Sequence, residues 1–448
     1  MPTAARRAAF AILLRVETQS SYATELLHGP LTADLSAPDA ALATEMVLGT
    51  LRWQGQLEFI AQQLVQRKWA SLDPEVLVAL RMGLYQLRFL TRIPARAAVH
   101  ESVELVKSAG KSSAAGLVNA VLRKGATANL ESLRPRKTTD LEWLAVETSH
   151  PAWLLNRWVK CFGETGARSL ASAQNKTPPT CLRVSSPSAE FSQIEETLRS
   201  DGVSLSPGRL LRNCRVVQAG NISRSDLFRR GELVAQEEAS QIVPLLLDVR
   251  PGHRVLDLCA APGNKTAQLA SQAGPSGKVI ACDLHPHRLR EMIVPPSGTP
   301  VLKVALDGRQ PLPFGSRFDR ILVDAPCSGT GTLRRHPEIK WRLQAQDLEV
   351  LSATQSLLLD RAAAALEPGG RIVYSTCSLE PEENQRVVEQ FLASHPDFRL
   401  LPLREDAARL QPFFLPESSA ILDSDFLETF PDRHGTDGFF AAILVRSQ

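Results

Sequence analysis

The chain has 448 residues, of which 44% are hydrophobic and 22% are charged. These values are typical of folded globular proteins and exclude a disordered or collagen-like chain, and the length predicts two or three domains. No run of eighteen apolar residues is free of charge, and Arg15 interrupts the apolar N-terminal stretch. We therefore expect neither a transmembrane helix nor a signal peptide, no membrane partner, and a cytoplasmic protein.

The net charge is +3, and the basic surplus lies in the N-terminal half. Residues 1–145 hold 17 Lys and Arg against 13 Asp and Glu, residues 146–235 hold 12 against 8, and residues 236–448 hold 22 against 27. Each of the first two segments is therefore +4. Such a surplus favours a nucleic-acid partner, although a merely solvated surface would show the same modest value.

The seven cysteines are widely spaced, with no CxxC pair. They stand at positions 161, 181, 214, 259, 282, 327 and 377. An odd number without paired spacing argues against a disulfide framework and a zinc ribbon, and we expect no bound metal. Free thiols remain, and their sequence context must decide which of them react.

Residues 1 to about 130 are predicted to form a small helical bundle. Its clearest helix spans 73–90, where Asp73 can cap the N-terminus, Pro74 suits the first helical position, and leucines at 77, 80, 84 and 87 mark one face. The polar stretch 126–140 contains a proline and lacks a helical period, so we predict a linker there. The first domain is assigned to residues 1–135.

Residues 146–235 are predicted to form a small α+β module. Its expected elements are helices at 151–162 and 191–200 and strands at 181–184 and 215–218. From residue 236 onward, strand-like apolar runs alternate with helical ones; the expected strands span 254–258, 278–283, 301–306, 319–324, 371–376 and 439–445. A long helix is expected at 345–366. This alternation predicts a largely parallel sheet wrapped by helices.

Ligands bind beyond the carboxyl ends of the strands in such sheets, so residues that follow each strand are candidates for a site. The first strand leads into Cys259-Ala-Ala-Pro-Gly-Asn-Lys-Thr266, whose small residues let the backbone approach a ligand before a helix opens. A plain tight turn is the alternative. The segment has neither the GxGxxG nor the GxxxxGK[ST] spacing, which argues against NAD and ATP.

Acidic residues end the next two strands. Asp283 can accept hydrogen bonds from two ribose hydroxyls, and Asp307, followed by Gly308, is placed to meet an adenine amino group. Each alone would be an ordinary capping or turn residue. The fourth strand ends in Asp324-Ala-Pro-Cys327-Ser-Gly, and the fifth leads into Ser-Thr-Cys377-Ser. Either cysteine alone is as readily a buried structural residue, but two at adjacent strand ends favour chemistry.

Three of these segments carry a resemblance to a known family: VLDLCAAPGNKT, ILVDAPCSGTGTLRRHPEIKW and VYSTCSLEPEEN. They are similar to the motifs of RNA 5-methylcytosine methyltransferases, and the whole chain resembles the bacterial Fmu/Sun/RsmB family of 16S rRNA cytosine-C5 methyltransferases. One departure is Asn264, which stands where the family usually has the second glycine of a PGGK turn. Asparagine tolerates positive φ, so we expect the turn to survive.

The resemblance implies a multidomain α and α/β fold. Its parts are an all-α domain similar to the antitermination factor NusB, a small α+β RNA-binding module, and a Rossmann-like methyltransferase domain at 236–448 with a mostly parallel seven-stranded sheet. S-adenosylmethionine is the implied cofactor, and 16S rRNA the implied partner. We expect a monomer, because no extended coiled-coil pattern suggests a dimer.

The resemblance also implies roles for single residues. The cofactor-binding residues would be Cys259, Ala260, Ala261, Pro262, Gly263, Asn264, Lys265, Asp283, Arg288, Asp307 and Asp324, with Asp283 at the ribose, Asp307 at the adenine and Asp324 near the methionine moiety and the target base. Cys377 would be the nucleophile, and Cys327 would help to release the product.

The need for a thiol follows from the chemistry. Carbon 5 of cytosine is a poor nucleophile, but a thiolate that adds to carbon 6 creates an enamine whose carbon 5 can attack a sulfonium methyl. Asp324 is the candidate to stabilise the adduct near N3 of the ring. Cys327, as a thiolate or through a water, is the candidate to remove the carbon 5 proton. Lys265 and the sulfonium are possible sources of the field that lowers a thiol pKa.

The cytosine must also leave its stack and enter a pocket. The basic residues after the PCSG turn are candidates to contact phosphates around the flipped base; they are Arg334, Arg335, His336, Lys340 and Arg342. A solvated basic loop is the alternative.

Other functions remain open at this point. A methyltransferase for exocyclic amino groups would favour an Asn/Asp-Pro-Pro-Tyr-like turn after the fourth strand, where this chain has Asp-Ala-Pro-Cys. DNA cytosine enzymes use a Pro-Cys nucleophile, which would make Cys327 the attacking residue. The substrate could also be tRNA or 23S rRNA, and a non-catalytic NusB-like RNA-binding protein is the alternative of another class.

Overall fold

The computed structural model describes residues 2–65, 68–184, 191–294 and 298–448. The chain forms two compact units. The helical unit comprises Met1–Thr177 together with Leu333–Ala345, and the α/β unit comprises Pro178–Thr332 and Gln346–Gln448. A search of the described residues finds no helix with the length and apolarity that a membrane crossing requires.

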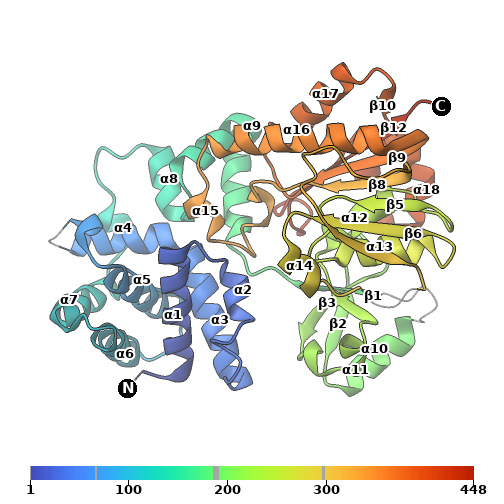
Figure 1. The fold of residues 1–448 in the computed structure, drawn as a ribbon. Coiled ribbons are helices and arrows are strands. Elements are labelled where there is room, and N and C mark those ends of the chain that lie inside the picture. The colour runs from blue at the N-terminus through green and yellow to red at the C-terminus, as the bar shows by residue number, and fades with distance from the viewer. Residues whose placement is uncertain (1, 66–67, 185–190, 295–297) are drawn as a thin grey trace. The chain divides into compact units, whose positions relative to one another are not determined.

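The helical unit confirms the predicted bundle (Figure 1). Its helices are α1 (Ala4–Gln19), α2 (Ala23–Leu27), α3 (Ala37–Arg52), α4 (Gln54–Leu64), α5 (Pro74–Phe89), α6 (Ala95–Ser108), α7 (Ala115–Gly125), α8 (Asp140–Thr148), α9 (Ala152–Gln174) and α15 (Ile339–Arg342). Helix α5 lies in the centre of the core, where Leu80, Met82 and Leu84 are completely buried. Its apolar face explains why a 3.6-residue period identified it.

One local expectation about this unit needs correction. Pro74 does begin α5, but the side chain of Asp73 makes no capping hydrogen bond and instead pairs with Lys111 at 3.3 Å. The expected linker at 126–140 is confirmed, because α7 ends at Gly125 and α8 begins at Asp140. The linker contains the 3₁₀ turn η3 (Glu131–Leu133), and Thr139 closes it by forming a capping box at the start of α8.

The predicted helix at 151–162 extends as α9 to Gln174, with a break at Gly163 where φ is +72°. Leu154, Leu155 and Trp158 of this helix are buried. The helix belongs to the helical unit, whereas the sequence placed it with the α+β module. The segment 333–345 joins the same unit, although in the sequence it follows the fourth predicted strand of the parallel sheet.

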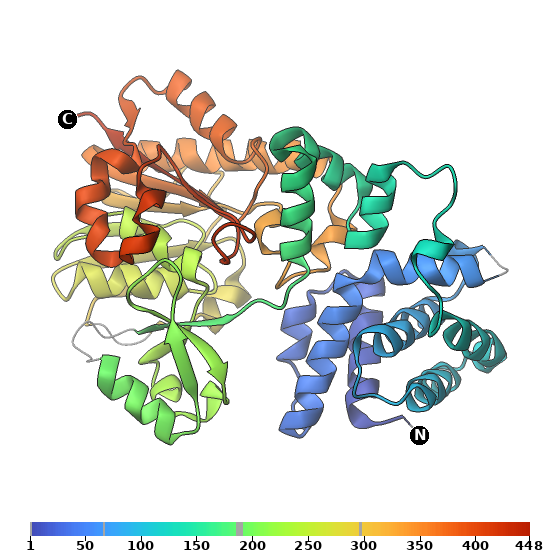
Figure 2. The same cartoon turned by 180° about the vertical axis from the view of Figure 1, so that it is seen from behind.

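The α/β unit begins with a small antiparallel sheet of order β2-β3-β1-β4. Its strands are β1 (Thr180–Val184), β2 (Ser204–Pro207), β3 (Cys214–Ala219) and β4 (Leu233–Ala235), and its helices are α10 (Phe191–Ser200) and α11 (Asp226–Arg229). Both helices lie on one face of the sheet (Figures 1 and 2), where Leu198, Leu227 and Leu233 share a core. The predicted module is confirmed, with β2 and β4 as additional strands.

The large sheet has the order β10-β12-β9-β8-β5-β6-β7, with β11 paired to β12. Its strands are β5 (Arg254–Asp257), β6 (Lys278–Asp283), β7 (Val301–Ala305), β8 (Phe318–Asp324), β9 (Leu366–Thr376), β10 (Phe398–Leu400), β11 (Leu427–Thr429) and β12 (Phe439–Arg446). Neighbouring strands from β7 to β9 are parallel, and β12 pairs with β9 in the antiparallel sense. All six predicted strands are present, and β10 and β11 are additional.

Helices cover both faces of this sheet, as a doubly wound fold requires. They are α12 (Glu238–Leu246), α13 (Asn264–Ala273), α14 (Pro286–Glu291), α16 (Asp347–Ala365), α17 (Gln385–Ser394) and α18 (Leu403–Leu410). One core joins α12, α13 and α18 to the sheet, and a second joins α16 and α17 to its other face (Figures 1 and 2). The carboxyl ends of β5, β6, β8 and β9 therefore meet at one edge.

Candidate active site

The turn between β5 and α13 is built around Gly263. This residue has a φ of +105°, and a Cβ atom there would lie 2.3 Å from Cγ of Met292. Asn264 is the first residue of α13 and is not among the residues with positive φ. The turn survives as expected, but the physical reason is different: the strained position falls on the glycine, and the replaced position is already helical.

A cavity of about 200 Å³ opens at this turn. Its lining residues are Ser240, Asp257, Cys259, Ala260, Ala261, Pro262, Gly263, Asn264, Lys265 and Asp324. The structure thus brings together the whole predicted turn and Asp324. Ser240 and Asp257 were not predicted as site residues, although an acidic residue in the otherwise apolar strand β5 was a usable signal for Asp257.

Asp257 fits a cationic ligand. Its carboxyl is 1% exposed, Oδ2 accepts a 2.6 Å hydrogen bond from the Thr266 hydroxyl, and Oδ1 has no partner within the described residues. Burial raises the pKa of this carboxyl to about 7, despite the opposing hydrogen bond from Thr266. A buried oxygen without a donor is costly, and a positively charged group in the cavity would satisfy it.

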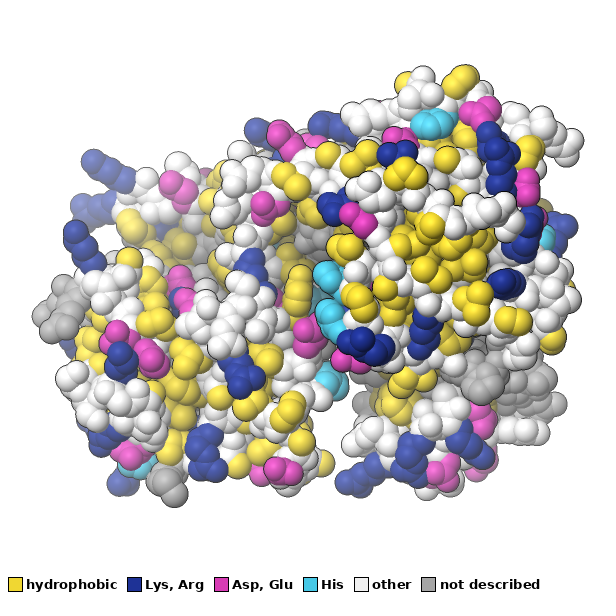
Figure 3. All heavy atoms as spheres, in the orientation of Figure 1, with side chains coloured by type: hydrophobic (Ala, Val, Ile, Leu, Met, Phe, Trp, Pro, Cys, Tyr) yellow, Lys and Arg dark blue, Asp and Glu magenta, His cyan; other side chains and the backbone are white. Residues whose placement is uncertain are grey.

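Asp283 lies beside the same turn. Its carboxylate accepts hydrogen bonds from the backbone N–H groups of Ala261 at 3.2 Å and His285 at 2.9 Å. Arg288 pairs with Asp283 at 3.7 Å and donates to the carbonyl oxygen of Ala261 at 3.1 Å. Figure 3 shows histidine and basic side chains gathered over α14, the helix that carries Arg288. Asp283, the residue predicted to bind the ribose, is therefore oriented by the turn between β5 and α13.

Asp307 follows β7, and its orientation is set by Arg309. The guanidinium and the backbone N–H of Arg309 both donate to the Asp307 carboxylate, and these hydrogen bonds lower the pKa of that carboxyl. The neighbouring Gly308 is required by packing, because a Cβ atom there would lie 2.8 Å from Cδ2 of Leu358. Neither Asp283, Arg288 nor Asp307 lines the small cavity itself.

Lys265 and Asp324 form a tight ion pair. Lys265 Nζ lies 2.6 Å from Asp324 Oδ2, and Ser375 donates to the other carboxylate oxygen at 2.7 Å. Burial alone would lower the pKa of Lys265, but the charge and hydrogen bond of Asp324 outweigh it and raise that pKa. The pair therefore carries a proton on Lys265 and holds Asp324 in one orientation. Ser375 was not predicted as a site residue.

The two predicted thiols lie in contact with each other, and Lys265 of the ion pair interacts electrostatically with Cys377. Cys327 Sγ lies 3.1 Å from Cys377 Sγ, and the backbone N–H of Cys377 donates to Cys327 Sγ at 3.2 Å. Both residues are partly exposed. The hydrogen bond to Cys377, together with burial, raises the pKa of Cys327 well above its ordinary value. Cys327 is therefore the member of the pair that keeps its proton.

A buried carboxylate supports both thiol loops. Glu383 is completely buried and accepts hydrogen bonds from the Ser328 backbone N–H at 2.8 Å, Gln355 Nε2 at 2.9 Å, and the hydroxyls of Ser328 and Ser378. The two serines directly follow the two cysteines in the sequence. Sequence reasoning missed Glu383, although the adjacent acidic residues Glu382 and Glu383 were visible in the EPEEN segment.

The basic segment after the PCSG turn differs from its prediction. Lys340 is 1% exposed, and Nζ donates to the carbonyl oxygens of Arg52 and Ser149 at 2.8 Å and to Asn175 Oδ1 at 3.2 Å. These acceptors stand at the C-terminal ends of α3, α8 and α9. Helix C-termini attract cations, so Lys340 caps three helices and is not available to RNA.

Arg342 has the same kind of role. Its guanidinium donates to the carbonyl oxygens of Val16, Ser20 and Ser21 at the C-terminal end of α1. Arg334 is buried, which also contradicts a phosphate contact in this conformation. Arg335 and His336 are partly exposed, and for them the RNA contact stays a prediction.

One further group of polar side chains lies in the small module. Sγ atoms of Cys181 and Cys214 and a carboxylate oxygen of Glu238 lie within 4.8 Å of one another. The carboxylate already accepts backbone N–H bonds from the three residues 209–211. Glu238 thus holds a turn of the small module against α12, where the adjacent thiols pack in the shared core.

Comparison with known families divides the chain into three consecutive parts. Residues 3–127 match the NusB family, residues 150–221 match the ferredoxin-like domain of RsmF/B-like methyltransferases, and residues 244–445 match the family described as 16S rRNA methyltransferase RsmB/F. The last match contains the cofactor turn, both thiols and Glu383.

Relatives match over nearly the whole length. The chain is 32% identical to a probable ribosomal RNA small subunit methyltransferase B of Bacillus subtilis, over 99% of this chain and 98% of the relative. It is 36% identical to the ribosomal RNA small subunit methyltransferase B of Pseudomonas putida, over 91% of each chain. The solved structure of PH0851 is similar with a TM-score of 0.80 and 27% identity, covering 99% of both chains.

The fold and the site together define a methyltransferase with a Rossmann-like catalytic domain, preceded by a NusB-like helical domain and a ferredoxin-like module. The chain belongs to the RsmB/F family of 16S rRNA methyltransferases.

Proposed function

We propose that this protein transfers a methyl group from S-adenosylmethionine to carbon 5 of a cytosine in 16S rRNA, through a covalent bond between Cys377 and carbon 6. The observation that carries this proposal is the 3.1 Å approach of Cys327 Sγ to Cys377 Sγ beside the Lys265–Asp324 pair. The names of the relatives supply the class of RNA.

The first step is addition of the Cys377 thiolate to carbon 6. The C5=C6 electron pair moves onto the ring, where negative charge develops at N3 and the carbonyl oxygen. The partly buried Lys265–Asp324 pair would support this charge with the proton that Lys265 carries. Because Ser375 also donates to Asp324, the carboxylate arrives already oriented.

The cofactor side of the site fits S-adenosylmethionine. The unpaired Oδ1 of Asp257 offers an acceptor for its ammonium group, and Asp283 is oriented toward the turn that the ribose would approach. Bound S-adenosylmethionine supplies the methyl group as a sulfonium, which carbon 5 of the adduct attacks. The small residues 259–263 let the backbone approach this ligand closely.

Cys327 is suited to the second half of the reaction. In the free protein, the hydrogen bond to Cys377 and burial keep the pKa of Cys327 high. Once Cys377 Sγ is bonded to carbon 6, that sulfur is neutral and no longer a strong acceptor, so the pKa of Cys327 falls and its thiol releases its proton to water. Cys327 can then take the carbon 5 proton, directly or through a water, and the electron pair of that C–H bond expels the Cys377 thiolate.

Covalent trapping tests the assignment of the thiols. The purified protein is incubated with S-adenosylmethionine and an rRNA fragment that contains 5-azacytosine, and adducts are counted on denaturing gels. Cys377→Ala should abolish the adduct, Cys327→Ala should make it accumulate, and Cys161→Ala, on exposed α9, should behave as wild type. Loss of the adduct in Cys327→Ala with retention in Cys377→Ala would reverse the two roles and refute the proposal.

The RNA is tested separately. Bisulfite sequencing is applied to 16S rRNA, 23S rRNA and tRNA from a deletion strain, with and without the restored gene. One cytosine of 16S rRNA should be deaminated in the deletion strain and should resist deamination again when the gene is restored. If methylation is lost only from tRNA or 23S rRNA, the proposed chemistry stands, but 16S rRNA is not the substrate. Failure of the purified protein to bind S-adenosylmethionine would favour a non-catalytic RNA-binding protein.

A further inference from the structure

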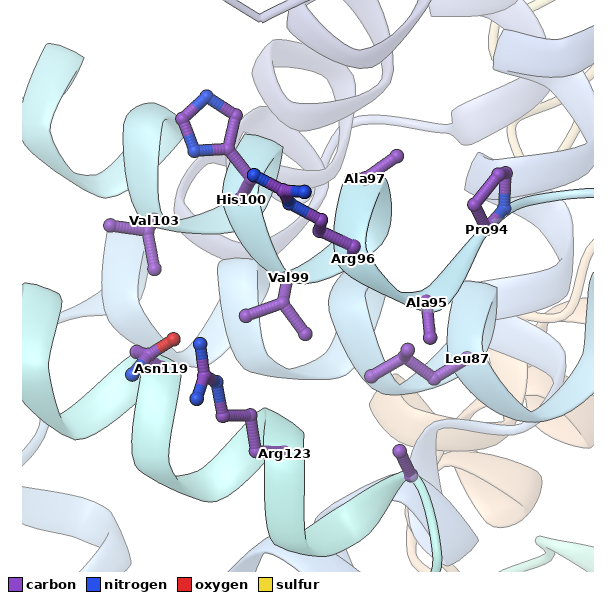
Figure 4. Close-up of a pocket in the computed structure, with 11 residues that line it drawn as sticks. Leu87, Pro94, Ala95, Arg96, Ala97, Val99, His100, Val103, Asn119 and Arg123 are labelled. Atoms are coloured by element: carbon purple, nitrogen blue, oxygen red, sulfur yellow. The ribbon is translucent and has the colours of Figure 1, made fainter.

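A groove of about 780 Å³ crosses the surface of the helical unit between α6 and α7. Figure 4 shows Val99 on its floor, with Arg96 and His100 of α6 on one side and Asn119 and Arg123 of α7 on the other. The remaining lining residues are Leu87, Pro94, Ala95, Ala97, Val103 and Ala126. The groove thus has an apolar floor and a basic rim, and none of its described lining residues is acidic.

The arginines of this rim are free, in contrast to others in the same unit. Arg96 and Arg123 are exposed, and neither guanidinium has a hydrogen bond or ion pair within the described residues. Elsewhere in the unit, Arg6 pairs with Glu101, and Arg81 pairs with Glu17 and Glu58. Two unpaired guanidiniums on opposite sides of one groove are available to bind an anion from outside.

The N-terminal end of α6 adds to the positive potential at the groove. Pro94 is the N-cap residue, no side chain of that residue caps the helix, and the first turn carries no acidic residue. The positive end of the helix dipole therefore stands beside Arg96. A phosphate group at this end of the groove would accept hydrogen bonds from the Arg96 guanidinium and would be attracted by the N-terminus of α6.

We propose that this groove binds a short unpaired stretch of RNA, with a base against the apolar floor and flanking phosphates at Arg96 and Arg123. The volume is within the range of sites that enclose a ligand of nucleotide size. Single-stranded RNA combines planar, weakly polar bases with regularly spaced phosphates, which matches an apolar floor between two basic sides. A protein partner would need carboxylates placed to pair with Arg96 and Arg123, whereas every RNA strand carries phosphates.

This inference rests on the proposed function, because it assigns part of the same RNA to a second surface. It goes beyond that function by naming where RNA outside the catalytic pocket is held. The α/β unit would hold the target base, and the groove would recognise an unpaired neighbouring segment by its shape and charge.

Binding of a labelled twelve-nucleotide single-stranded RNA and of a 16S rRNA fragment, followed by fluorescence anisotropy, tests the proposal with the full-length protein. The double variant Arg96→Ala/Arg123→Ala should weaken binding by roughly 10-fold, and loss of two phosphate contacts should reduce the slope of log K against log salt by about 1.4. Asn119→Trp narrows the groove without a change in charge and should also weaken binding.

The matched control is Arg15→Ala/Lys160→Ala, which removes two exposed charges of the same unit outside the groove and should stay within about two-fold of wild type. Circular dichroism confirms folding of each variant. If both groove variants bind RNA like the control, the inference is overturned and the groove is left for a protein. If the wild-type protein itself binds neither RNA, the proposed function fails instead.

Discussion

Ser328 and Ser378 stand with their hydroxyl oxygens 3.0 Å apart, and both donate to the same carboxylate oxygen of Glu383. Each serine directly follows one of the two thiols. A single buried carboxylate therefore ties the loop after β8 to the loop after β9. The 3.1 Å separation of the sulfur atoms depends on this link, because each cysteine is one peptide bond from an anchored serine.

Glu383→Ala should slow methyl transfer much more than it weakens cofactor binding. The substitution leaves the donors of Ser328, Ser378 and Gln355 without an acceptor and lets the thiol loops move apart. A displacement of about 1 Å at reacting atoms costs on the order of 100-fold in rate. We expect kcat to fall roughly 10- to 100-fold, with the Kd for S-adenosylmethionine within about two-fold.

Glu383→Gln supplies the conservative comparison, since it keeps one oxygen acceptor and should recover part of the rate. Glu382→Ala is the matched control, because the neighbouring Glu382 pairs with Arg386 near the surface. Equal losses of kcat in Glu383→Ala and Glu382→Ala would show that Glu383 does not position the thiols.

Asp257 should make stability and cofactor binding depend on pH. Its pKa is about 7 in the folded protein and near 3.9 in the unfolded chain, so the folded state holds the extra proton between these values. The unliganded protein should lose stability as pH rises from about 4 to about 7, by on the order of a few kcal/mol. Urea unfolding at pH 5 and pH 8 should show this loss in wild type but not in Asp257→Asn.

The same carboxyl should influence cofactor affinity in the opposite direction. A cationic ligand favours the ionised form, so calorimetric affinity for S-adenosylmethionine should rise as pH increases through 7 and then level off. Asp257→Asn should remove this rise. An unchanged pH profile in that variant would place the titrating group elsewhere.

Asp283→Ala should weaken S-adenosylmethionine binding more than Asp307→Ala. Asp283 is 6% exposed and orders the β5–α13 turn through the Ala261 N–H, whereas Arg309 is the one side chain among the described residues that orients the more exposed Asp307. We expect a loss of at least about 10-fold for Asp283→Ala and less than that for Asp307→Ala. Calorimetry decides the order, and a larger effect at Asp307 would contradict the assignment of the ribose to Asp283.

Lys340→Met should destabilise the protein without changing RNA binding. The substitution removes the cap shared by α3, α8 and α9 and leaves buried carbonyl oxygens unpaired, which costs roughly 3 kcal/mol. Thermal unfolding should show the loss, and exposed Lys160→Met should not. A phosphate contact would instead reduce the RNA salt slope by about 0.7 in Lys340→Met while stability stayed at the wild-type value.

The sequence was sufficient for features that depend on local pattern. Apolar runs predicted every parallel strand from β5 to β9. Strands β5, β6, β8 and β9 are largely buried, and such strands are recognisable from their own residues, whereas the more exposed edge strand β7 was recognised from its apolar run alone. The carboxyl ends of parallel strands share one edge, so the pattern also brought Cys259–Lys265, Asp324, Cys327 and Cys377 into one site.

Basic character misled the prediction for the segment after β8. Lys340 and Arg342 have the composition of a phosphate-binding loop, and no local feature distinguishes that role from helix capping. Their acceptors are backbone carbonyls at residues 16, 20, 21, 52 and 149, which are about 190 to 330 positions away in the sequence.

The sequence by itself determined which elements form and which residues reach the ligand edge of the sheet. Only the tertiary structure decided which charges face solvent, that Glu383 joins the two thiol loops, and that Asp257 keeps an unpaired oxygen. The reason is physical: strand and helix periodicity is a property of neighbouring residues, whereas the burial of a charge depends on partners that only the folded chain brings within hydrogen-bonding distance.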